Sequence, residues 1–103
     1  MSEKLKELME LLSTPSFSSS ARVGILLSLY YLGRVTFVDL LKATDLPKSS
    51  LFAHLQVLED EGLILVKKSI TLQGPRTIVV LTDKGKTAVL RYISLVRELE
   101  ELK

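Results

Sequence analysis

The single histidine of this 103-residue chain, His54, lies one helical turn after Ser50 in the stretch SSLFAHLQVLEDEGLI. A serine and a histidine at this spacing could form a nucleophile–base pair. Such a pair also needs a group that orients the histidine and an oxyanion hole, and no Gly-x-Ser-x-Gly turn accompanies these residues. Serines at a helix start are more often N-caps. We therefore expect no catalytic residues and no enzyme activity.

The sequence also gives little support for a metal-binding site. The sequence has no cysteine, which excludes thiolate ligands, disulfides and cysteine nucleophiles together. A lone imidazole forms a metal site only where carboxylates converge on it from elsewhere. We expect no metal and no cofactor. For His54 we expect structural support first and contact with a phosphate second.

The charges are unevenly distributed along a chain whose net charge is only +2. No acidic residue occurs between Glu61 and Asp83, whereas Lys67, Lys68 and Arg76 all lie there. Clustered cations without acids are typical of surfaces that neutralise nucleic-acid phosphates. An ordinary solvated hairpin would carry the same residues, so the pattern needs support from the neighbouring elements.

Length and composition indicate one domain with a packed core, because the chain has 103 residues and 47% of them are hydrophobic. No apolar run is long enough to cross a bilayer. The opening MSEKLKELMELL mixes acids and bases with its leucines, unlike a signal peptide. We expect a cytoplasmic protein with no membrane partner.

Hydrophobic spacing predicts the elements that position these side chains. Apolar residues recur at helical spacing near both ends of the chain. The β-branched runs LILVKKSI and RTIVVLT flank TLQGP, which predicts a hairpin with Gly74 and Pro75 at its tip. The serines of SFSSS, Thr36 and Thr82 are expected N-caps. Helices are predicted over about 2–13, 21–32, 37–44, 48–62 and 83–102, with a minimal strand at RVTF.

Two short helices joined by a tight turn and followed by a hairpin form a helix-turn-helix with a wing. The predicted fold class is mainly α with a small β-hairpin, an α+β fold. On the helix over 48–62, the core side holds Leu51, Leu55, Leu58 and Gly62, and His54 lies on a flank. The outer face is small or polar and almost uncharged: Ser49, Ala53, Gln56 and Asp60, with Ser50 and Val57 beside them.

This stretch resembles the recognition helix of winged-helix transcriptional regulators of the ArsR and MarR kind. PRTIVVLTDKGKTAV is similar to the second wing strand of the same families, and the likeness extends over about residues 20–92. The motif positions are filled by Ser50, Leu51, His54, Leu55, Leu58, Glu59, Gly62, Leu63 and Ile64, and then by Arg76, Thr77, Leu81, Thr82 and Gly85.

The resemblance implies a sequence-specific regulator that binds double-stranded DNA as a homodimer. The helix over about 48–62 would enter the major groove, and the wing over about 63–82 would contact the backbone or the minor groove. Arg or Lys is frequent in related helices where this chain has Ala53, Gln56 and Val57, and serine is frequent at Phe52. The expected DNA contacts are Lys48, Ser49, Ser50, Ala53, His54, Gln56, Val57, Lys67, Lys68 and Arg76.

A winged-helix core is complete at the second wing strand, so an apolar stripe beyond it needs a partner. We expect one winged-helix domain over residues 1–103, with a core of about 18–82 and dimerisation through the helices over 2–13 and 83–102. The uncharged recognition face leaves an alternative open, a protein-interaction module or subunit of a larger complex. No residue marks a small-molecule effector site. The expected dimer residues are Leu5, Leu8, Leu12, Val89, Tyr92, Val96 and Leu99.

Overall fold

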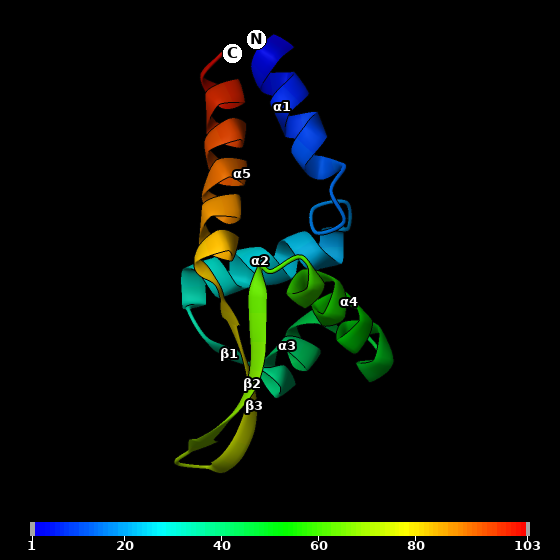
Figure 1. The fold of residues 1–103 in the computed structure, drawn as a ribbon, viewed down its shortest axis with the longest axis vertical. Helices are drawn as coiled ribbons and strands as arrows, with labels where there is room; N and C mark the ends of the chain where they lie inside the picture. Colours follow the sequence, from blue (N-terminus) through cyan, green and yellow to red (C-terminus); the bar gives the residue numbers. More distant parts are fainter. Residues whose placement is uncertain (1, 103) are drawn as a thin grey trace.

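The computed structural model describes residues 2–102 and is elongated, with extents of 50 × 24 × 22 Å. Figure 1 shows three parts along the long axis. The first and last helices lie side by side at one end, the other helices and the sheet form the middle, and a hairpin projects at the far end. The elements are α1 (Ser2–Leu12), α2 (Ser20–Leu32), β1 (Val35–Thr36), α3 (Phe37–Thr44), α4 (Lys48–Asp60), β2 (Ile64–Thr71), β3 (Gly74–Leu81) and α5 (Asp83–Glu101).

The predicted mainly helical α+β class, a winged helix with flanking helices, is confirmed. The strands form an antiparallel sheet in the order β1-β3-β2, because the short β1 pairs with β3 and adds a third strand to the hairpin. Val66 lies opposite Val79, and both point toward the helices. Because side chains alternate along a strand, Lys68 shares this inner face, and Lys67 lies on the outer face of the sheet.

The predicted hairpin tip is wrong by two residues. Pairing continues to Thr71 opposite Gly74, so the connection consists of Leu72 and Gln73. Gly74 has φ +98°, a conformation that suits glycine after so short a connection. Pro75 lies inside β3 opposite Ile70. Proline is tolerated there because β1 pairs only with residues 78–79 of β3, which leaves that edge free at position 75.

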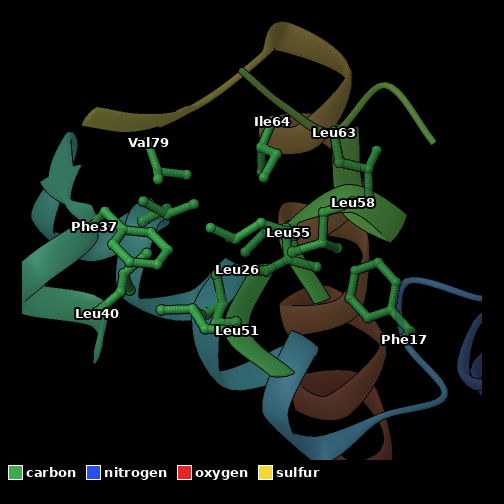
Figure 2. Close-up of a cluster of buried hydrophobic side chains, with 13 residues drawn as sticks. Phe17, Leu26, Phe37, Leu40, Leu51, Leu55, Leu58, Leu63, Ile64 and Val79 are labelled. Carbon is green, nitrogen blue, oxygen red and sulfur yellow. The ribbon is translucent and has the colours of Figure 1, made fainter. Parts of the chain in front are cut away.

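The core forms where α4 meets α2 and the inner face of the sheet. Leu51, Leu55 and Leu58 of α4 are buried, as the sequence predicted. Figure 2 shows these side chains pointing into one cluster, with Leu26 contributed by α2 and Val79 by the sheet. Burying a leucine side chain stabilises a fold by about 1.5–3 kcal/mol. One face of α4 is therefore fixed to the body, and the opposite face is left to solvent.

Three of the predicted N-caps are confirmed. Ser19 accepts from the amide of Arg22 at 3.3 Å, and Thr36 accepts from that of Asp39 at 3.1 Å. Thr82 accepts from the amide of Gly85 at 3.0 Å.

The expectation that serines cap α4 is wrong. Its N-cap is Pro47, which has no side-chain oxygen to offer, and Ser49 and Ser50 lie inside the first turn. Within residues 2–102 neither hydroxyl has a hydrogen-bond partner, so both are available to another molecule.

Candidate nucleic-acid interface

The outer face of α4 is open to solvent. Lys48, Ser49, Ala53 and Gln56 are exposed. Ser50, Val57 and His54 are half-buried at the edges of this face. All seven DNA contacts predicted on this helix therefore lie on its outer face or at the edges of that face. The buried leucines cause this, because they fix the rotation of the helix about its own axis.

Gln56 does not point freely into solvent. Its Nε2 donates a hydrogen bond to Oδ1 of Asp60 at 2.7 Å, one helical turn later. A carboxylate can only accept, so Asp60 sets which side of the amide carries the nitrogen. Nε2 keeps a second hydrogen and Oε1 stays available, so Gln56 can still present one donor and one acceptor together.

Phe52 is a residue of this surface that sequence reasoning did not include. Its ring stacks on that of Phe37, with centroids 4.6 Å apart and planes 28° apart. Phe37 is buried in the core, whereas Phe52 keeps 51% of its surface exposed. The sequence signal that could have identified it is a large aromatic residue in α4 that lies outside the leucine stripe. The stack holds the apolar ring of Phe52 beside Gln56, on the side of α4 that faces α3.

The cations of the wing lie on two faces. Lys67 and Arg76 share the outer face of the sheet, where Arg76 pairs across the strands with Ser69. Arg34, which the sequence prediction missed, extends over the same face and its Nη2 donates to Ser69 Oγ at 3.5 Å. Lys68 lies alone on the inner face, toward α4. The wing therefore offers a positive charge on each side.

His54 has a partner outside its own helix. Its Nδ1 lies 3.0 Å from Nη1 of Arg22 in the first turn of α2. The guanidinium also donates from Nε to the carbonyl oxygen of Pro15 at 2.8 Å. This flank of α4 is thus tied to the segment between α1 and α2.

The terminal helices pack against each other within one chain, as Figure 1 shows. On one side of the pair, Lys4 Nζ lies 3.2 Å from Glu98 Oε2, and Arg91 Nη2 lies 3.9 Å from Glu7 Oε2. Helical spacing puts the predicted dimer residues on the other side. Val89 is the exception, because it is fully buried in the core of its own chain. The others are exposed or half-buried: Leu5, Leu8, Leu12, Tyr92, Val96 and Leu99.

Two further observations concern other kinds of site. Within residues 2–102, no three histidine, cysteine, aspartate or glutamate side chains are grouped so that they could hold a metal ion. None of the helices in this range combines the length and hydropathy needed to span a bilayer.

Comparison with known proteins agrees with this geometry. The family model described as "Winged helix DNA-binding domain" matches residues 21–100. The chain is 35% identical over 85 residues to the uncharacterised protein MJ0432 of Methanocaldococcus jannaschii, covering 82% of this chain and 92% of that protein. It also resembles a solved transcriptional regulator homologue from Pyrococcus horikoshii OT3, with 33% identity, a TM-score of 0.76, and coverage of 96% and 95% of the two chains.

A more distant neighbour is a structure from Enterococcus faecalis V583 that is assigned to the MarR family of transcriptional regulators. Its TM-score is 0.76 at 22% identity, with 96% of this chain and 87% of that chain covered, so it shows a shared fold. The chain belongs to the winged helix DNA-binding domain family. Its fold is shared with that MarR-family structure, so the fold that the resemblance implied is confirmed.

Proposed function

We propose that this protein is a transcriptional regulator that binds double-stranded DNA sequence-specifically, with α4 in the major groove and the β2–β3 wing on the backbone or minor groove. One observation carries the proposal. The buried leucines turn a small, polar face of α4 outward, beside a hairpin that has three cations and no acid between Glu61 and Asp83. The family match and the name of the Pyrococcus horikoshii relative point the same way.

Base recognition on this face would use hydrogen bonds and methyl contacts. Gln56 presents the donor and acceptor that pair with N7 and N6 of adenine. Thymine methyl groups would contact the apolar side chains of Ala53 and Val57 and the ring of Phe52. The face has no arginine for a bidentate contact with guanine. We therefore propose that each half-site contains A·T pairs where α4 contacts the bases.

We further propose that the protein acts as a homodimer through the apolar side of the α1/α5 pair. Leu5 keeps 46% and Val96 40% of its surface exposed on this side, where the described part of the chain has no further layer to cover them. Exposed apolar stripes on packed helices are typical of oligomer contacts. A two-fold dimer would place two copies of α4 about one DNA turn apart, ~34 Å.

A protein-interaction module is the second candidate. The observation in its favour is the uncharged face of α4, flanked by exposed apolar side chains such as Phe52 and Val38. An interface of this kind responds weakly to salt, because it releases few counterions.

The test is selection of binding sites from random duplexes, followed by titration of the selected duplex and a scrambled one at several salt concentrations. The proposed function predicts a consensus with two-fold symmetry and a steep linear fall of log affinity with log salt, with a slope of about −0.9 per phosphate neutralised. No enrichment, together with salt-independent behaviour, would reject DNA binding and favour the second candidate.

A further inference from the structure

Arg22 holds the recognition helix to the preceding segment through two hydrogen bonds. It is the one charged residue in the sequence of α2 and lies in the first turn. Its Nε donates to the carbonyl oxygen of Pro15 at 2.8 Å, and its Nη1 lies 3.0 Å from Nδ1 of His54. Because guanidinium has five N–H donors, further donors remain after these two bonds.

This contact determines the tautomer of His54. Arginine can only donate, so Nδ1 must accept, and the ring proton of the neutral histidine must then sit on Nε2. The two ring nitrogens point in different directions, so Nε2–H is directed away from Arg22. Within residues 2–102, Nε2 has no hydrogen-bond acceptor. A half-buried side chain thus presents one fixed, unused donor at the edge of α4.

The same edge carries an uncompensated positive charge. Among the described residues, no carboxylate lies within ion-pair distance of Arg22, since the ion pairs present involve Lys4 and Arg91. The acids of α4 are turned elsewhere, because Glu59 accepts from the amide of Val66 and Asp60 from Gln56. An anion would therefore meet a guanidinium and an imidazole N–H at an edge from which the two acids of α4 are turned away.

The position of this edge identifies the anion. Along α4, Phe52 and Glu59 lie on the flank that contacts α3 and β2, whereas His54 lies on the opposite flank, next to α2. A helix with its side chains is about 10–12 Å wide and fills a major groove about 12 Å wide, so phosphates border both of its flanks. The wing is on one flank, and Arg22 with His54 is on the other.

We propose that Arg22 and His54 contact a DNA phosphate on the side of the recognition helix opposite the wing. The inference rests on the proposed function and adds residues to it. Nε2–H of His54 donates to a phosphate oxygen, and the charge of Arg22 attracts the same group. Arg22 is also a positioning residue, because its bonds to Pro15 and Nδ1 hold the ring in the donating tautomer. Recognition would then rest on backbone contacts at both edges of the groove.

Nitrogen NMR of the untagged, full-length protein tests the positioning role. His54 is the only histidine in the chain, so its ring signals are unambiguous. The proposal requires Nε2 to be protonated and Nδ1 to be unprotonated in the wild type. Arg22→Lys keeps the charge but lacks the branched guanidinium group that reaches both Pro15 and His54. The preference of the ring proton for Nε2 over Nδ1 should therefore be lost. A wild-type ring that carries its proton on Nδ1 would overturn the assignment.

Salt-dependent binding tests the phosphate contact. Arg22→Gln should make the slope of log affinity against log salt shallower by ~0.9 per protomer, or about two units for a dimer, on selected and scrambled duplexes alike. Arg22→Lys should retain the slope, and so should the control Arg97→Gln on the exposed surface of α5. An unchanged slope in Arg22→Gln would overturn the contact. A wild type that binds no duplex would instead reject the proposed function itself.

Discussion

The backbone of Gly85 in α5 lies against the carbonyl oxygen of Leu63, so closely that a Cβ atom at position 85 would overlap that oxygen. Thr82 completes the same junction. Its hydroxyl donates to the carbonyl of Gly62 at 2.6 Å, and its amide donates to the carbonyl of Leu63 at 3.0 Å. The end of α4, the base of the β2–β3 hairpin and the start of α5 therefore meet at one point. This contact explains physically why the stretch needs a glycine three residues after a threonine.

Gly85→Ala should lower the free energy of unfolding by about 1–3 kcal/mol, because the added methyl group must displace backbone atoms. Gly24→Ala is the matched control. Gly24 lies inside α2 with no atom within 4 Å of a built Cβ. That change should stabilise the protein by roughly 0.5–1 kcal/mol, since alanine favours the helix. Urea denaturation measures both, and equal stability of Gly85→Ala and the wild type would argue against the close approach in solution.

The dimer proposal predicts that Val96→Glu produces monomers, because an unpaired charge in an apolar interface costs several kcal/mol, about 3–5 kcal/mol when fully buried. Ser94→Glu on the exposed surface of the same helix should leave the dimer intact. Light scattering measures the mass, and circular dichroism should show the helical signal of both variants largely unchanged. A Val96→Glu protein that stays dimeric would move the interface to another surface.

The sequence predicted the fold because local signals agreed with the global arrangement. The leucine spacing of α4 identified its buried side, and Thr36 and Thr82 identified helix starts that the structure retains. Strand alternation is equally local, because it places the adjacent Lys67 and Lys68 on opposite faces of β2. Each of these inferences depends on residues close together in the chain.

Local sequence patterns could not predict contacts between segments that are far apart in the chain. Arg22 and His54 are 32 positions apart, and nothing in either local sequence indicates that they meet. The stack of Phe52 on Phe37 likewise depends on how α3 and α4 cross. The hairpin tip was misplaced because Gly74 and Pro75 favour turns in general, whereas strand register decided which residues form this one.

Phe52→Ala should reduce both stability and discrimination. Loss of the stack on Phe37 should cost about 0.5–1.5 kcal/mol beyond the lost burial. If Phe52 touches a thymine methyl group, uracil at that position of the duplex should weaken wild-type binding and leave Phe52→Ala binding unchanged. Tyr31→Ala, at an exposed aromatic of α2, is the control for loss of an aromatic side chain. Equal sensitivity to uracil in wild type and Phe52→Ala would exclude the contact.

Gln56→Ala should change the preferred base at one position per half-site, by roughly 1–3 kcal/mol if the contact is bidentate. Asp60→Ala should weaken preference at the same position, because the amide loses its orienting acceptor. Unlike Gln56→Ala, it should also raise affinity for every duplex, since it removes a negative charge from the outer face of α4. Binding-site selection with both variants measures these effects. A general gain in affinity without a change of preference would limit Asp60 to an electrostatic role.

The wing should control affinity without controlling sequence. Lys68 lies on the inner face, toward α4, whereas Lys67 lies on the outer face, so one of this pair at most is expected to reach phosphate. We expect Lys68→Ala to make the salt slope of a dimer shallower by about two units, at ~0.9 per contact, and Lys67→Ala to leave it unchanged.

Arg76 is two residues beyond Gly74, close to the projecting tip, and Arg76→Ala should weaken selected and scrambled duplexes by similar factors. Titrating the variants against both duplexes across a salt series separates the roles. A loss confined to the selected duplex would make Arg76 a reader of bases in the minor groove. If all three variants match the wild type, the wing does not touch DNA, and the protein-interaction function becomes the better account of this hairpin.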